Sequence, residues 1–349
     1  MTSVSPATER LSSQAAERQP AQDDAGRAGA PARGWVSDSV LSVLAGSSWL
    51  LFAFITLHWP DLNDWGRGSE FSHAAILFGA ALILAAGLGA VSERGAARLR
   101  RSTPWLLALG LFFSLWQAAT AKFGLLPQPF FPPPHAILEV FLDDYPKLVE
   151  SVIASIKLEL FGFSLGACAG FVVGVLLGWS RGFGYWAHPI MRFIGPLPAI
   201  AWLPIAFIAF PSSWSASIFL IALTTGFPVA VLTWSGVASV NSAYYDVART
   251  LGASPAFLVF KVAIPAALPQ VFVGLFMGLG ASFAVLVTAE MMGVKAGLGF
   301  YLQWAQGWAS YANMYAALIV MSVMCSSMIT LLFKARDRVL SYKKAEVQW

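Results

Sequence analysis

The sequence predicts an all-α polytopic membrane protein with about eight transmembrane helices. Hydrophobic residues make up 57% of the chain and charged residues only 11%, whereas a soluble protein carries about 25% charged residues. Several apolar runs approach or exceed the roughly 20 residues that cross a bilayer as a helix. The expected spans are 40–59, 73–92, 104–123, 149–179, 187–210, 215–237, 267–291 and 312–333.

The distribution of lysine and arginine predicts the orientation of these spans. Cytoplasmic segments of membrane proteins carry an excess of Lys and Arg. With both termini in the cytoplasm, only Arg67, Lys122, Lys147 and Lys295 fall on the outer side. The opposite orientation reverses this ratio. We therefore expect the polar segment 241–265 to be cytoplasmic.

Composition also predicts how the chain is divided. Residues 1–36 are rich in Ala, Ser, Gln, Arg and Pro without apolar periodicity, so we expect a disordered cytoplasmic N-terminus. We expect 37–103 to form an accessory transmembrane pair, 104–340 to form the main transmembrane domain, and 341–349 to form a cytoplasmic tail. The first apolar run begins near Val40, too far into the chain for a signal peptide.

The segment 241–265 has the signals of two short helices around a joint. Asn241 and Ser242 are favourable N-caps, and Gly252 stands where a C-terminal glycine belongs. Ser254 followed by Pro255 predicts the start of a second helix. Pro265 is expected to end this unit just before the next apolar run.

The same segment resembles the EAA loop of ABC-importer permeases, which reads Glu-Ala-Ala, three residues, Gly, nine residues and Ile-x-Leu-Pro. Ala248, Gly252 and Pro265 match this pattern, and conservative replacements stand at Asp246, Val247, Val262 and Ile264. The resemblance implies that the loop is a coupling helix that docks on a cytoplasmic ATPase subunit. An ordinary amphipathic connector is the alternative interpretation.

Leu126-Pro127 and three prolines at 132–134 precede an amphipathic stretch, 135–149. This arrangement resembles the Leu-Pro-x-Pro start and following helix of permeases of the nitrate, sulfonate, taurine and bicarbonate group, and the resemblance is continuous from about Trp105 onward. The resemblance implies a type I, MetI-like importer core in a bacterial inner membrane, with the first two helices as an addition, and a small anion as solute. The implied partners are ATPase subunits that bind ATP and Mg²⁺, an extracytoplasmic solute-binding protein and a second permease copy. We expect no catalytic residue, metal site, cofactor or nucleic-acid partner in this chain, which has no phosphate-binding loop of the Walker type.

Glycines recur every four residues along the fourth predicted span. This spacing places them on one helix face and allows another helix to approach closely. The spacing does not distinguish a helix of the same chain from one of a second copy. The glycines are Gly162, Gly166, Gly170, Gly174 and Gly178.

The fifth predicted span is interrupted by prolines and resembles a Pro-x-Pro-x-x-Ala-x-x-Pro segment of the same permeases. Interrupted backbone at membrane depth is tolerated where it is buried in protein or lines a cavity. We interpret the segment as lining the solute pathway, with a buried kink as the alternative. The residues that we expect along the pathway are Pro198, Trp202, Pro204, Thr225, Ser282, Glu290 and Lys157.

Ionisable residues inside spans are functional candidates because they are costly to bury. Lys157 and Glu159 are two residues apart, so they point in nearly opposite directions on a helix. Lys157 can contact solute or extend to the membrane interface. Glu290 can support a gate or contact solute, and 293–311 is expected to form a gate-like hairpin at the outer interface.

Two other classes of protein remain as alternatives. A secondary transporter, or another channel-like protein without ATP coupling, would show paired repeats with membrane-embedded charges. A membrane enzyme would need a cluster of catalytic side chains near one face. The sequence shows neither a second copy of the proline-rich segment nor such a cluster.

Overall fold

The computed structural model describes residues 33–63, 66–87, 93–195 and 197–341. Contacts divide the chain into two compact units, Met1–Gly124 and Leu125–Trp349. Seven helices of the described part are long and apolar enough to span a membrane, and a bent helix pair can supply an eighth span. This confirms the all-α polytopic class. Most of the expected disordered N-terminus and C-terminal tail lies outside the described residues, but α2 (Arg33–His58) already begins inside the segment expected to be disordered.

The described part of the N-terminal unit contains three long helices, α2 (Arg33–His58), α3 (Gly68–Gly87) and α4 (Glu93–Gln117). The α4 helix continues as a π-helical turn, η1 (Ala118–Lys122). Gly46 and Gly79 bring α2 and α3 into backbone contact, and Gly110 of α4 lies against Ser48 of α2. The sequence predicted a boundary at residue 104, whereas the first unit ends at Gly124. The contact at Gly110 attaches the third span, α4, to α2.

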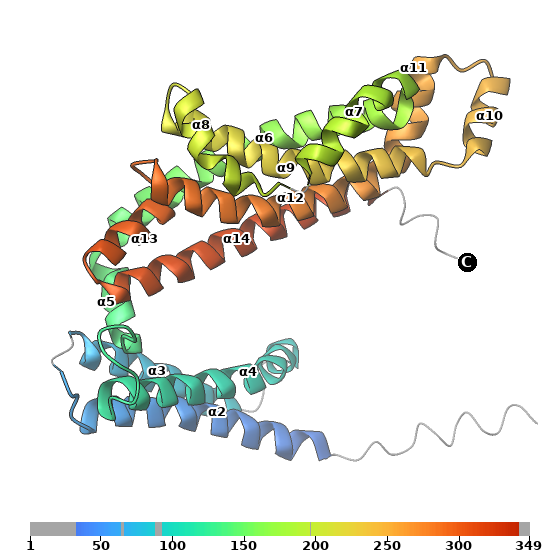
Figure 1. Cartoon of the computed structure of the whole chain (residues 1–349). Helices are drawn as coiled ribbons and strands as arrows, with labels where there is room; N and C mark the ends of the chain where they lie inside the picture. The colour runs from blue at the N-terminus through green and yellow to red at the C-terminus, as the bar shows by residue number, and fades with distance from the viewer. Residues whose placement is uncertain (1–32, 64–65, 88–92, 196, 342–349) are drawn as a thin grey trace, which may run out of the picture. The chain divides into compact units, whose positions relative to one another are not determined.

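The C-terminal unit contains the remaining elements of the described residues, and Figure 1 shows α10 and α11 at one end of this unit with α13 at the opposite end. Its elements are α5 (Pro134–Asp143), α6 (Tyr145–Trp179), α7 (Arg181–Ile194), η2 (Ala199–Trp202), α8 (Leu203–Ala209), α9 (Ser213–Ala238), α10 (Ser242–Thr250), α11 (Pro255–Phe257), η3 (Leu258–Ala263), α12 (Ile264–Met292), α13 (Leu298–Gly307) and α14 (Tyr311–Val339).

The glycine face of α6 packs against α9 of the same chain. A Cβ atom on Gly166 would meet the backbone of Ala222, and one on Gly170 would meet the carbonyl oxygen of Gly226. Gly162 and Gly178, at the two ends of the row, are similarly close to side chains of α9. The sequence left the partner of this face open, and the structure places an intrachain helix there.

The α9 helix is also covered on a second side by α12. Gly274 and Gly278 of α12 approach the backbone of α9 at Val229 and Thr225. The largest hydrophobic core of the unit forms around these three helices and includes Leu220 and Leu279. The position of α9 between α6 and α12 therefore fixes the centre of this unit.

The predicted fifth span is not one helix. It consists of α7 and the pair η2 and α8, bent by 88° between Ile194 and Ala199. Proline has no backbone N–H and a fixed φ, so Pro198 and Pro204 oppose a continuous helix. The α7 helix also begins six residues earlier than expected, because the side chain of Ser180 caps it by accepting from the amide of Phe183.

The expected end of the loop unit at Pro265 was wrong. α11, the π-helical turn η3 and α12 follow one another without a break, and they form one candidate span from Pro255 to Met292. The amide of Ile264 bonds to the carbonyl of Val259, five residues earlier. Where the hydrogen-bond pattern changes from π to α, one residue needs no amide donor. Proline has no backbone N–H, so it is tolerated at that position.

The glycine contacts of α6 lead to a stability prediction. Gly170→Ala should destabilise the unit by about 1–3 kcal/mol, because its Cβ requires the backbone at Gly226 to move. Thermal unfolding of the purified protein in detergent measures the effect. The control is Gly280→Ala in α12, where a Cβ meets no atom within 4 Å. Equal melting temperatures for the two variants would contradict the proposed role of this contact.

Candidate functional site

The loop that links α9 to α12 is a capped helix with a glycine joint. The side chain of Asn241 accepts a hydrogen bond from the amide of Ala243 at 2.9 Å and starts α10. The amide of Gly252 bonds to the carbonyl of Arg249, and that of Ala253 bonds to the carbonyl of Ala248. These two bonds form a Schellman motif, which needs a left-handed residue at Gly252. Gly252 has φ of +80°, so the expected glycine C-terminus is confirmed.

Apolar side chains of α10 are exposed instead of buried. Tyr244 is 64% exposed, Val247 62% and Leu251 83%. With Phe257 they line an open groove of about 780 Å³. Large apolar groups that lie together on an otherwise polar segment indicate a surface that binds another molecule.

The opposite side of α10 is fixed to the unit. The ring of Tyr245 contacts that of Trp179 at the end of α6, with centroids 5.9 Å apart. It also packs on the small core formed by Val237, Ala263 and Ala267. Burial raises the pKa of the Tyr245 hydroxyl. Through Tyr245, α10 is therefore in contact with α6 and with the small core that α9, η3 and α12 form.

The residues that match the EAA pattern fall on two elements. Asp246 is exposed on α10 and lies 3.6 Å from Arg249, and Val247 and Ala248 line the groove. Val262 of η3 and Ile264 and Pro265 of α12 are half-buried where the loop rejoins the long helix. The residues that match the EAA pattern thus lie both on the exposed helix α10 and at the point where the loop joins α12.

A second group of residues lies inside the unit, at the end opposite α10. The carboxylate of Glu290, 1% exposed, accepts hydrogen bonds from the Ser155 hydroxyl at 2.7 Å and from the amide of Gly299 at 2.8 Å. Ser155 in turn accepts from the amide of Leu298 at 2.8 Å. Gly297 has φ of +115°, and a Cβ there would overlap the Glu290 carboxylate. Glu290 therefore attaches the start of α13 to α6 and α12.

Glu159 is the other buried carboxylate of this region. It lies one turn from Ser155 on α6, and its Oε1 accepts a hydrogen bond from the hydroxyl of Ser282 on α12. The side chain has no exposed surface, and its Oε2 has no hydrogen-bond partner among the described residues. Lys157 is exposed, so the expected opposite directions of Lys157 and Glu159 are confirmed. Sequence reasoning missed Ser155, although its four-residue spacing from Glu159 placed both on one face.

The residues expected along a pathway do not form one site in this structure. Thr225, Ser282 and Glu290 are buried between helices. Pro198 and Pro204 are exposed on the broken helix, with Trp202 partly exposed beside them. Lys157 lines a separate groove on α6. A solute could contact the buried three only after the helices move.

Polar side chains join α13 to its neighbours at the same end of the unit. Asp144, which precedes α6, accepts hydrogen bonds from Tyr301 of α13 at 3.2 Å and from Asn313 of α14 at 2.9 Å. The hydrogen bond from Lys147 lowers the pKa of Asp144. Burial raises the pKa of Tyr301 to about 12, and the negative charge of Asp144 adds to this effect. The segment 293–311 contains the single helix α13, and these contacts join it to the start of α6 and to α14.

Residues 166–341, just over half of the chain, match the family model described as binding-protein-dependent transport system inner membrane component. The chain belongs to this family. It is the permease type of ABC-importer subunit, and the resemblance of the loop 241–265 to such permeases agrees with this assignment. Among the described residues, no group of three His, Cys, Asp or Glu side chains could hold a metal ion.

Curated relatives extend the match. The bicarbonate transport system permease CmpB of Synechococcus elongatus is 35% identical over 191 residues, which cover 54% of this chain and 66% of that protein. A probable ABC transporter permease of Brucella melitensis is 33% identical, covering 56% and 79%. The nitrate import permease NrtB of Synechococcus elongatus is 29% identical, covering 59% and 77%. The chain thus spans about two thirds of the length of the bicarbonate permease.

Among solved structures, the inward-facing methionine ABC transporter MetNI gives a TM-score of 0.47 at 19% identity, covering 56% of this chain and 95% of that one. The family assignment rests on the sequence matches and not on this likeness.

Ser155→Ala should loosen α13. The substitution removes an acceptor for the amide of Leu298 and a donor to Glu290, and leaving such buried groups unpaired costs about 1–3 kcal/mol. Amide hydrogen exchange at the start of α13 should accelerate by roughly tenfold or more, because about 1.4 kcal/mol corresponds to a factor of ten. Ser217→Ala is the matched control, since that buried hydroxyl bonds only within α9. Equal protection of the α13 amides from hydrogen exchange in both variants would argue against a stabilising role of the Ser155 hydrogen bonds.

Alkaline pH should weaken the same end of the unit. The pKa of Tyr301 is about 12 when folded, against 10 for an ordinary tyrosine. Its contribution to stability is complete below pH 10 and is lost as the pH rises through about 12. The ring centroid of Trp304 lies 5.7 Å from that of Tyr301, so quenching of Trp304 fluorescence reports the ionisation of the Tyr301 hydroxyl. Tyr301→Phe should abolish the transition, whereas the exposed Tyr145→Phe should retain it. A transition unchanged in Tyr301→Phe would refute this assignment.

Proposed function

We propose that this chain is the membrane subunit of an ATP-driven importer that passes a small anion delivered by a solute-binding protein. The observation that carries the proposal is the exposed apolar face of α10 on the otherwise polar loop. In this proposal α10 is the coupling helix, and its groove with Phe257 receives the ATPase subunit. ATP and Mg²⁺ are bound by that partner and not by this chain.

The connections of α10 support a mechanical role. Its Schellman joint at Gly252 and the continuous run from Pro255 to Met292 attach it directly to α12. Closure of the ATPase dimer would then move α10 as a rigid body, and α12 would carry the displacement to α13 through Glu290. Alternation between inward- and outward-facing states follows from ligands that favour one arrangement over the other.

The solute class is inferred from the relatives and from the interior of the unit. The bicarbonate and nitrate permeases are similar over more than half of this chain. Buried polar groups such as Thr225 and Ser282 are mostly neutral, which suits passage better than tight binding. Specificity would then reside in the extracytoplasmic binding protein. We place both termini in the cytoplasm of a bacterial cell and expect two permease copies to enclose the pathway.

Variants of α10 test the ATPase contact. Leu251→Glu and Val247→Glu place a charge on an apolar docking surface and should reduce ATPase co-purification and transport by about tenfold or more, because charge burial without a partner is costly. Ser242→Glu is the control. It adds the same charge at the N-terminus of α10, outside the groove, where the helix dipole favours a negative charge. Pull-down from membranes with the intact complex measures the effect. Normal assembly of both groove variants would contradict the coupling role.

Cysteine accessibility tests the pathway assignment. Ala201→Cys lies on the exposed side of the broken helix, next to Trp202, and should react with small aqueous thiol reagents in assembled complexes. Leu203→Cys is the control because Leu203 is 3% exposed and packs in the core. The reaction rate should differ between nucleotide-free and ATP-bound complexes. Protection of Ala201→Cys in every state would remove this segment from the pathway.

A further inference from the structure

A groove of about 630 Å³ runs along α6 from the end that carries α13. Tyr145 and Glu150 lie at its mouth, and Lys157 lines it further along the helix. The other walls are apolar and include Leu158, Trp214 and Val294. The lining is mostly apolar, so a charge in this open groove is somewhat less screened than one in bulk water.

Lys157 is an unpaired cation in this groove. Among the described residues, no carboxylate lies within ion-pair distance of its amine. Lys122, the lysine at the end of another span, is neutralised by Asp61 at 2.7 Å and by backbone carbonyls. Charged residues within membrane spans are usually paired, so an unpaired lysine on the candidate span Tyr145–Trp179 is a candidate contact for an external anion.

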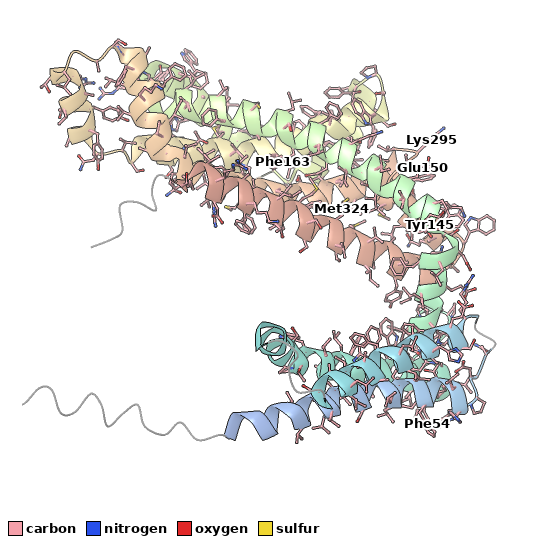
Figure 2. All side chains as sticks on the ribbon, turned by 180° about the vertical axis from the view of Figure 1, so that it is seen from behind. Phe54, Tyr145, Glu150, Phe163, Lys295 and Met324 are labelled. Atoms are coloured by element: carbon pink, nitrogen blue, oxygen red, sulfur yellow. The ribbon has the colours of Figure 1, made fainter. Side chains whose placement is uncertain are left out.

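A second hollow of about 300 Å³ adjoins the mouth of the groove and shares Glu150 and Ala296 with it. Figure 2 shows Lys295 and Glu150 near Tyr145, at this end of α6. Lys147 also lines the hollow but already pairs with Asp144 at 2.8 Å. Lys295 is therefore the additional cation available to a ligand that enters from the mouth.

Glu150 does not neutralise the deeper lysine. It precedes Lys157 by seven residues on α6, which corresponds to about 10 Å along the helix axis. Glu150 and Lys295 both line the hollow at the mouth, whereas Lys157 lines only the groove. A ligand would meet a mixed-charge entrance and then a single positive charge beside Trp214.

We propose that this groove binds an oxyanionic group, with Lys157 as its principal contact and Lys295 as a second cation at the mouth. Two sources share this chemistry: a small solute anion such as bicarbonate, nitrate or a sulfonate, and the headgroup of an anionic lipid. The proposal that the anion is a transported solute rests on the proposed import function. The proposal that the groove binds an oxyanion does not depend on that function.

The test uses a cysteine one turn from Lys157. Ile153→Cys lines the same groove and is exposed, and the native Cys168 and Cys325 are first changed to Ala. The probes are the methanethiosulfonates with an anionic sulfonatoethyl or a cationic trimethylammonioethyl group, at constant ionic strength. The full complex is reconstituted in phosphatidylcholine bilayers.

The anionic reagent should react faster than the cationic one, and Lys157→Gln should lower this ratio by roughly tenfold, as removal of a focusing charge would do. Lys334→Gln is the matched control, because that exposed lysine lies on α14 outside the groove. Equal rates for the two reagents, or a preference that survives Lys157→Gln, would overturn the proposal. ATPase co-purification is measured on the same samples. This measurement distinguishes a groove that binds no oxyanion from a chain that is not part of an ATP-driven importer.

Competition then identifies the source of the anion. Slower sulfonatoethyl labelling on adding bicarbonate or nitrate, relative to chloride, supports a solute. Slower labelling only when phosphatidylglycerol is included in the bilayer supports a lipid headgroup. Labelling that neither addition changes would contradict oxyanion binding, even if the reagent preference were present.

Discussion

The contact between α6 and α9 is the constraint on which the rest of the C-terminal unit depends. Gly166 and Gly170 bring the two helix backbones together, because any Cβ at these positions would overlap α9. The α9 helix is in turn packed on α12 through Gly274 and Gly278. In a bilayer, where apolar burial provides little force between helices, such close packing is a main source of association. The three helices therefore have one register relative to one another.

This register brings the buried polar groups together. Ser155 and Glu159 lie one turn apart on α6, and Ser282 and Glu290 lie on the side of α12 that meets them. Glu290 can then bind the start of α13 because Gly297 has no side chain in the way. A slip of one helix would leave these groups unpaired at membrane depth, which is costly. The glycine contacts and the polar contacts thus specify the same arrangement.

Some polar groups of the unit are satisfied within the chain, whereas other side chains have no partner among the described residues. Near α13, the carboxylates of Asp144 and Glu290 are satisfied by donors of the same chain. On α10, apolar side chains have no cover among the described residues, and on α6 the amine of Lys157 has no counter-ion there. These incomplete surfaces are where we place the partner and the anion.

The sequence alone predicted features that depend on local chemistry. Hydropathy predicted the class, the four-residue spacing predicted the close-packed face of α6, and the Asn241 and Gly252 signals predicted the ends of α10. Features that depend on tertiary contacts could not be obtained in this way. The spacing of Gly170 did not identify α9 as its partner, and Pro265 was read as a helix end because π-helical bonding before it has no clear sequence signal. The grouping of α4 with α2 and α3 also depends on packing at Gly110.

The central claim is that this permease works as the membrane subunit of an ATP-driven complex, and its most direct test is the composition of that complex. The tagged chain is purified from its native membrane in mild detergent, and mass spectrometry identifies and quantifies the proteins that remain bound. The account predicts a stoichiometric ATPase with a Walker-type phosphate-binding loop. Isolation of the chain alone, under conditions that keep other ABC complexes intact, would contradict it.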